Sequence, residues 1–279
     1  MAAYRIIIDS CGELTETMKK DGHFCNVALE LMVDDYCVAD DEKFNQAEFL
    51  KKVKESKNCP KSACPSPESY IEAFGDVDHI YLITLSSQLS GSYNSAVLAK
   101  NIYLEEHPQK KVYVFDSCSA SIGETLIGLK VQELEESGLD FDEVVSGTEQ
   151  YIKEQATYFV LETLETLRKN GRLSNLKAVV ASALSIKPVM GSTPEGMICQ
   201  LGQARGMNKA LDKLVQNVLE RTKNTEQRIL AISHCNCPAR AAFVKEKMEK
   251  LAKFKDIIVV NTAGVSTMYA NDGGIIVAI

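Results

Sequence analysis

Clusters of hydroxyl and small residues follow several apolar runs, and their hydroxyl and amide groups could bind an anion. The longest covers residues 86–92 and ends in Ser90, Gly91 and Ser92, directly before a helical pattern. A helix that begins there would direct free N–H groups and its positive dipole end at an anion. Each serine could equally serve as a helix N-cap. Similar clusters lie at residues 9–12, 62–67, 116–121 and 261–264.

Nucleophilic catalysis is the alternative chemistry for the same residues. Ser90 or Cys64 could act as a nucleophile if a base lay within hydrogen-bond reach. The chain has only four histidines, and His234, at the end of an apolar run, is the best placed of them. The Gly-x-Ser-x-Gly motif of many hydrolases does not occur. A serine or cysteine hydrolase therefore remains an alternative without a sequence motif of its own.

Other classes of site find little support in the sequence. Cys235 and Cys237 are one residue apart, which does not suit a zinc knuckle, and no second pair follows. The two glycine motifs that bind phosphate, Gly-x-x-x-x-Gly-Lys and Gly-x-Gly-x-x-Gly, do not occur, so we expect no nucleotide and no other cofactor. The formal net charge of -7 argues against nucleic-acid binding.

The cysteine content and the hydropathy pattern favour a cytoplasmic protein. The number of cysteines, nine, is odd, and no segment near the N-terminus looks like a secretory signal. We therefore expect reduced thiols. No stretch approaches the roughly 18 apolar residues of a membrane span.

The first half of the chain alternates apolar runs with helical patterns. This alternation predicts a doubly wound, mostly parallel sheet, and the continuous apolarity of the strands suits a sheet covered by helices on both faces. We expect strands at residues 4–8, 27–33, 80–84 and 112–115, and helices at residues 46–55, 67–74, 93–105, 122–136 and 142–154.

The second half predicts another α/β domain, with a mixed sheet. We place the boundary near residue 158, which gives an N-terminal domain of residues 1–158 and a C-terminal domain of residues 159–279. We expect helices at residues 161–168, 176–184, 207–221 and 238–251, and strands at residues 185–189, 196–200, 229–232, 257–260 and 274–279.

Seven short motifs occur in a fixed order along nearly the whole chain. The most specific covers residues 87–93 and matches Ser-x-Leu-Ser-Gly-Thr-Tyr except that Ser92 replaces the Thr. The others lie at residues 9–10, 62–67, 116–123, 170–174, 184–188 and 204–206. In this series the chain resembles the DegV family of bacterial fatty-acid-binding proteins.

The resemblance implies a carrier and not an enzyme. It implies that a long-chain fatty acid such as palmitate or oleate lies in a tunnel between the two domains, with its carboxylate near the Ser-Gly turn. It also implies a fatty acid kinase as the partner that phosphorylates this carboxylate. The residues that we expect to bind the ligand are Ser62, Ser90, Gly91, Ser92, Ser117, Arg172 and Tyr269. Candidates for the tunnel wall are Leu161, Leu164, Leu167, Val179, Leu184, Ile186, Val189 and Met190.

The expected head-group site departs from the family pattern at two positions. Ala270 stands where the family has a histidine that helps to hold the carboxylate, and Tyr269 is its neighbour. Cys64 replaces the family glutamine. These changes leave open a different acyl ligand, weaker binding, or a paralogue that does not serve a kinase. A regulatory module that binds another small anion is a further alternative.

Overall fold

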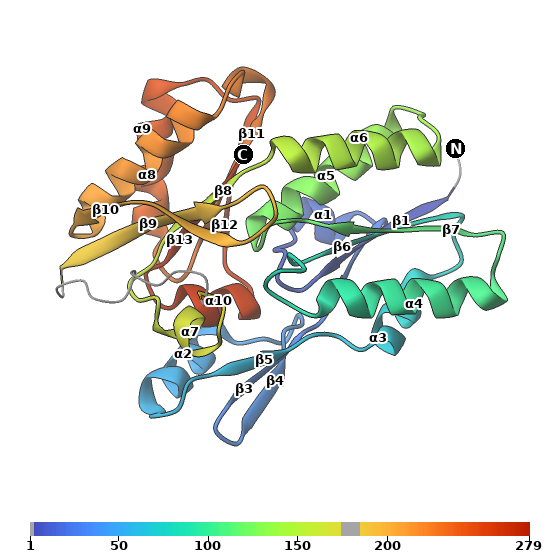
Figure 1. The fold of residues 1–279 in the computed structure, drawn as a ribbon, viewed down its shortest axis with the longest axis horizontal. Helices are drawn as coiled ribbons and strands as arrows, with labels where there is room; N and C mark the ends of the chain where they lie inside the picture. Colours follow the sequence, from blue (N-terminus) through green and yellow to red (C-terminus); the bar gives the residue numbers. More distant parts are fainter. Residues whose placement is uncertain (1–2, 174–184) are drawn as a thin grey trace.

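Two large sheets with helices on both faces make up most of the structure (Figure 1). The computed structural model describes residues 3–173 and 185–279. The first sheet has four strands, all parallel, and the second has six strands in a mixed arrangement. The chain is therefore an α/β protein with a parallel sheet in its N-terminal part and a mixed sheet in its C-terminal part, which confirms the expected fold class.

The first sheet is covered on both faces because its strands are apolar on both faces. Ile6 and Ile8 of β1 pack towards one set of helices, whereas Ile7 packs towards the other. The strand order is β2 (Phe24–Val27), β1 (Tyr4–Asp9), β6 (His79–Thr84) and β7 (Lys111–Asp116). One face carries α1 (Glu16–Lys20), α5 (Ile122–Glu136) and α6 (Phe141–Glu154), and the other carries α3 (Pro67–Phe74) and α4 (Ser92–Glu106).

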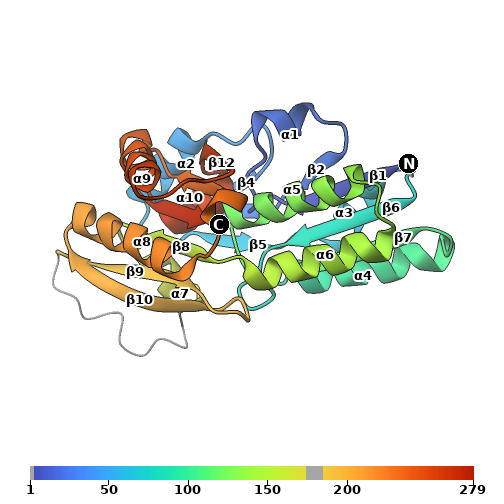
Figure 2. The same cartoon turned by 90° about the horizontal axis from the view of Figure 1, so that it is seen from above.

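The second sheet has the order β10 (Ile198–Arg205), β9 (Ile186–Ser192), β8 (Thr157–Val160), β13 (Ile275–Ala278), β11 (Ile229–His234) and β12 (Asp256–Asn261). Its outer face packs against α8 (Met207–Arg221) and α9 (Pro238–Leu251). A short 3₁₀ helix, η1 (Thr225–Gln227), precedes β11. The inner face packs against α5, α7 (Glu165–Lys169) and α10 (Gly264–Ala270). Helix α5 thus lies between the two large sheets (Figure 2).

A third, antiparallel sheet connects the N-terminal part to α10. Its strand order is β4 (Tyr36–Ala39), β3 (Glu30–Val33) and β5 (Lys61–Ala63), and α2 (Gln46–Glu55) packs beside it. Asp40, which follows β4, is buried and accepts hydrogen bonds from the backbone N–H groups of Gly264 (2.6 Å) and Val265 (2.8 Å). The carboxylate therefore satisfies two free donors at the start of α10.

Several helices begin and end where the sequence predicts, because their ends carry local signals. Ser66 caps α3, and Pro67 occupies its first turn. Asp140 and Glu143 form a capping box at the start of α6. The predicted bounds of α2, α3, α5, α8 and α9 agree with the structure.

Two expectations about individual elements are wrong, and several short elements, among them α1, β4, β5, η1, β8 and α10, were not expected at all. The single strand expected at residues 27–33 is two strands in different sheets, β2 and β3. The helix expected at residues 161–168 is only the short α7. Strand β8 was missed because four residues are too few to show periodicity, and α10 was missed because glycine, serine, threonine and valine are weak helix formers. The helix expected at residues 176–184 lies outside the described residues.

Two further observations concern the domain boundary and membranes. Residue 158 lies inside β8, which already belongs to the second sheet, and the boundary near it stays a prediction. Within residues 3–173 and 185–279, no helix combines the length and apolarity that crossing a membrane requires.

Candidate functional site

A cavity lies between the first and second sheets, at the carboxyl ends of the parallel strands. The empty space in and around it measures about 840 Å³, including open solvent at its mouth. Its wall is mostly apolar and includes Leu85 and Leu89 from the N-terminal part and Phe159, Ile198 and Ile276 from the C-terminal part. Ligands of open α/β sheets bind at this edge.

Two carboxylates, the buried Asp9 and the half-buried Asp116, hold the loop that carries Ser90. Asp9, the last residue of β1, accepts hydrogen bonds from the N–H groups of Leu85 (2.8 Å) and Cys11 (3.1 Å). Asp116, the last residue of β7, accepts from the N–H groups of Ser87 and Cys118, both at 3.1 Å. The loop after β6 is thus fixed from both neighbouring strands.

The Ser-Gly-Ser turn places Ser90 in the cavity wall and the next two residues behind it. The Ser90 hydroxyl lies 3.0 Å from the Ser92 hydroxyl and accepts a hydrogen bond from the Ser92 N–H (3.2 Å). Gly91 precedes α4 and gives it no side-chain cap. A Cβ atom on Gly91 would lie 3.2 Å from the Cys64 sulfur, so the turn and the segment after β5 are closely packed.

Arg172, Tyr269 and Ser62 form a polar group beside Ser90. Arg172 Nε donates to the Leu89 carbonyl (3.0 Å), and its guanidinium lies 5.8 Å from the centre of the Tyr269 ring. The Tyr269 hydroxyl lies 3.4 Å from the Ser62 hydroxyl. These residues come from the turn after α7, from α10 and from β5, and the fold alone brings them together.

Among the described residues that line the cavity, Arg172 is the only Lys, Arg or His, and none is an Asp or Glu. None of the salt bridges within the described ranges involves Arg172, which donates hydrogen bonds to the carbonyls of Leu89 and Asn170. A half-buried guanidinium without an acid partner favours an anionic ligand.

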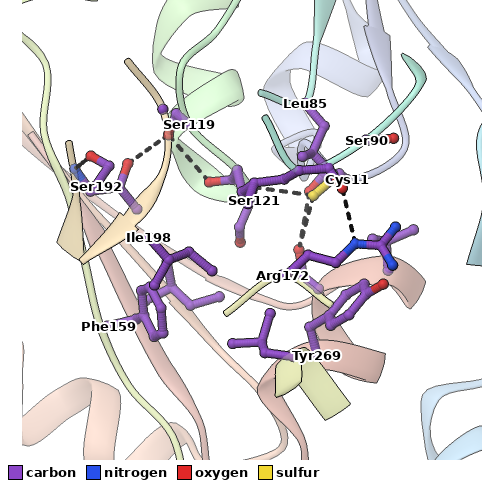
Figure 3. Close-up of a pocket in the computed structure, with 18 of the residues that line it drawn as sticks. Cys11, Leu85, Ser90, Ser119, Ser121, Phe159, Arg172, Ser192, Ile198 and Tyr269 are labelled. Carbon is purple, nitrogen blue, oxygen red and sulfur yellow. Dashed lines mark hydrogen bonds between the residues drawn. The ribbon is translucent and has the colours of Figure 1, made fainter. Parts of the chain in front are cut away.

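Figure 3 shows the two sides of the cavity. Ser90, Arg172 and Tyr269 lie on one side, and Phe159, Ile198 and Ser192 lie on the other. The charged group of the cavity therefore lies on one side, and the large apolar side chains of Phe159 and Ile198 lie across from it. Such an arrangement suits an amphiphile with one anionic end.

The structure separates the predicted ligand residues into two sets. Ser62, Ser90, Arg172 and Tyr269 line the cavity, whereas Gly91, Ser92 and Ser117 do not. Ser117 is buried and its hydroxyl accepts from the N–H of Ser119 and donates to the carbonyl of the same residue, which stabilises the turn at residues 117–121. Direct contact of any of these residues with a ligand stays a prediction.

Only some of the residues predicted for the tunnel wall line the cavity. Leu161 and Leu167 line the cavity, whereas Leu164, Ile186, Val189 and Met190 do not. Val189 and Met190 are fully buried core residues of the second sheet. Val179 and Leu184 lie outside the described residues.

Several lining residues were missed from the sequence. Ser119 and Ser121 lie within a serine cluster whose position after a strand could have identified them. Cys11 lies within the polar cluster at residues 9–12, whereas Ser266 carried no signal, because its place in the wall depends on contact between α10 and the turn after β1. Ala270, at the place of the family histidine, also lines the cavity and is buried.

The cavity lacks the arrangement that a serine or cysteine hydrolase needs. No histidine is among its described lining residues, and Cys64 lies outside the wall. His234 accepts a hydrogen bond at Nδ1 from the N–H of Cys237 (3.3 Å), and burial lowers its pKa. Among residues 3–173 and 185–279, no group of three metal-ligating side chains is placed to hold a metal ion.

The chain matches one protein family over almost its entire length. The profile described as "Uncharacterised protein, DegV family" matches residues 3–279. A DegV domain-containing protein of Streptococcus gordonii is 34% identical over 279 residues, which cover 98% of this chain and 97% of the relative.

Solved structures with the same fold include proteins with fatty acids bound. A DegV family protein from Ruminococcus gnavus, described with vaccenic acid, is 54% identical with a TM-score of 0.96, and the match covers 99% of each chain. The Streptococcus pneumoniae Fatty Acid Kinase (Fak) B3 protein, loaded with linoleic acid, is 32% identical with a TM-score of 0.90, and the match covers 99% of this chain and 98% of that one. From the profile, the relatives and the fold together, this chain is a member of the DegV family.

Proposed function

We propose that this protein binds a long-chain fatty acid, such as palmitate or oleate, in the cavity between its two large sheets. The observation that carries the proposal is Arg172, a single cation without an acid partner among the described residues, in an otherwise apolar wall. The related proteins that hold vaccenic and linoleic acid support the same ligand class.

The carboxylate would lie among Ser62, Ser90, Arg172 and Tyr269, and the tail would extend towards Phe159 and Ile198. Burying roughly 14 methylenes of palmitate gives about 11 kcal/mol of gross driving force. Part of it offsets the lost freedom of ligand and side chains. Hydroxyl donors and one guanidinium share the carboxylate charge, which would be costly to bury alone.

Tyr269 supplies the donor that the family histidine would give. Ala270 at that position has no polar atom, but the Tyr269 hydroxyl lies beside Ser62 at the cavity wall. Burial raises the pKa of Tyr269, against the opposing effects of the Ser62 hydroxyl and the Arg172 charge. The phenol therefore stays protonated at neutral pH and keeps a proton to donate.

The protein would act as a carrier, without catalysis of its own, and present the carboxylate to a fatty acid kinase. The similarity to the Fak B3 protein supports this partner, and the absence of a histidine among the described lining residues disfavours a hydrolase. The cytoplasmic location expected from the sequence stays a prediction.

Binding by the delipidated protein tests the proposal. Wild-type protein should bind palmitate or oleate, and Ser90→Ala should weaken binding by about 1–3 kcal/mol through one lost charge-assisted hydrogen bond. Ser87→Ala is the matched control, because Ser87 lies in the same loop but outside the cavity wall. Mass spectrometry of an organic extract should also identify a copurified fatty acid.

Two results would contradict the carrier function. Delipidated protein that binds no fatty acid would reject the ligand class. Turnover of acyl esters that disappears in Ser90→Ala would show a hydrolase.

A further inference from the structure

A buried glutamate lies directly behind the cavity wall. The hydroxyl of Ser121, a lining residue, donates to both carboxylate oxygens of Glu13 at 2.9 Å. Ser266 is also a lining residue and donates to the carbonyl of Cys11 (3.1 Å). Glu13 is only 4% exposed, so its carboxyl group is close to the ligand space but shielded from bulk water.

Glu13 shares its surroundings with other acids. Glu124 on α5 and Asp9 on β1 are fully buried, and neither oxygen of Glu124 has a hydrogen-bond partner within the described structure. The other groups around Glu13 are the Cys11 thiol, Ser121 directly before α5, Thr125 of α5, Ser266 of α10 and Ser233 of β11. No Lys, Arg or His of the described residues forms an ion pair with Glu13, Glu124 or Asp9.

Buried carboxyl groups without a cation retain protons to higher pH than exposed ones. Burial raises the pKa of Glu13 to about 7, against the opposing effect of neighbouring hydroxyls. Burial first, and then the charge of Asp9, raises the pKa of Glu124 well above its usual value. Glu13 can therefore change charge near neutral pH, whereas Glu124 holds its proton more strongly than an exposed glutamate does.

We propose that fatty-acid binding is coupled to protonation of Glu13: the protein takes up a proton at this carboxyl group when the acyl carboxylate binds, and ionised Glu13 weakens binding. This inference rests on the proposed function. An ionised Glu13 and the ligand carboxylate are like charges at a water-poor site, so each disfavours the other. Ligand binding and proton binding are linked, so each changes the other by the same factor. If ionised Glu13 lowers the affinity for the ligand carboxylate by some factor, the bound carboxylate raises the affinity of Glu13 for a proton by that factor.

The size of the coupling follows from Coulomb's law. Two unit charges about 10 Å apart, at an effective dielectric constant of about 20, repel enough to change a binding constant by about tenfold. We therefore expect the affinity for an ionised fatty acid to fall about tenfold between about pH 6 and about pH 8.5.

Calorimetric titration of delipidated protein with dodecanoate measures both quantities. Dodecanoate stays ionised across the range, because its carboxyl pKa is close to that of an exposed glutamate. Titrations in buffers of different ionisation enthalpy should give a net proton uptake, between zero and one per ligand, that is largest near pH 7. Dodecanol has the same tail without the charge and should bind with no such dependence on Glu13.

Two matched variants test whether Glu13 causes the proton uptake and the pH dependence of affinity. Glu13→Gln should remove the proton uptake and flatten the affinity profile, since the amide can still accept from Ser121. Glu124→Gln makes the same change at the neighbouring buried acid and should keep the wild-type profile. Proton uptake by the wild-type protein alone tests the coupling if Glu13→Gln does not fold.

The outcomes distinguish this inference from the proposed function. Absence of dodecanoate binding at every pH would reject fatty-acid binding itself. Tight binding without proton uptake, or a pH profile that is unchanged in Glu13→Gln, would overturn only the coupling to Glu13.

Discussion

Tyr269→Phe separates the role of one hydroxyl from the packing around it. The change removes the hydroxyl beside Ser62 and keeps the ring, whose centre lies 5.8 Å from the Arg172 guanidinium. The lost contact to Ser62 is long, at 3.4 Å, and joins two neutral groups. The free energy of unfolding should therefore fall by no more than about 1 kcal/mol.

The effect on ligand binding should be larger, because the lost partner is a charged carboxylate. A hydrogen bond to a charged group contributes about 1.5–3 kcal/mol, which corresponds to a rise in the dissociation constant of roughly 10- to 150-fold. Titration of delipidated protein with oleate measures this change, and urea unfolding monitors stability in parallel.

A neutral ligand provides the control for Tyr269→Phe. Oleyl alcohol has the same tail but no charge, so its affinity should change by much less than that of oleate. If the variant binds oleate as tightly as the wild-type protein, Tyr269 does not replace the family histidine. If both ligands weaken equally, the effect comes from packing.

Two further perturbations test the charges around the site. Arg172→Met keeps much of the side-chain volume but should weaken the binding of oleate by about 1.5–3 kcal/mol. The binding of oleyl alcohol should weaken less. An equal loss of binding free energy for the two ligands would argue against an ionic role of Arg172. Burial raises the pKa of Asp40 to about 6 and that of Glu13 to about 7, so the folded state binds more protons than the unfolded state above about pH 4. The free energy of unfolding should therefore decrease as the pH rises from about 5 to about 8, by on the order of 3 kcal/mol for Glu13. Urea titrations at several pH values measure this trend, and Glu13→Gln should show a smaller decrease than the wild-type protein. An equal decrease in the two proteins would contradict the assignment to Glu13.

Asp40 shows how a distant segment determines a local element. Helix α10 begins at Gly264 and has few strong helix formers, and a carboxylate from more than two hundred residues earlier satisfies its first N–H groups. The sequence shows only a polar cluster at residues 261–264 after a strand and does not predict this helix. The helix nevertheless supplies Ser266, Tyr269 and Ala270 to the cavity wall.

The sequence by itself determined the features with local causes. Caps and helical periodicity determined the bounds of α2, α3, α5, α8 and α9, because the hydrogen bonds of a helix join residues close in the chain. The alternation of strands and helices determined the α/β class. Short motifs identified Ser62, Ser90 and Arg172, and the motif series indicated the family.

Only the tertiary structure decided how these pieces combine into a site. The division of residues 24–33 between two sheets, the cavity, and the placement of Tyr269 beside Ser62 all depend on contacts between distant segments. The acid cluster of Asp9, Glu13 and Glu124 has the same origin, since a carboxyl group retains its proton only where folding has removed water and supplied no cation. Burial is a property of the packed chain, and no local pattern of residue types specifies it.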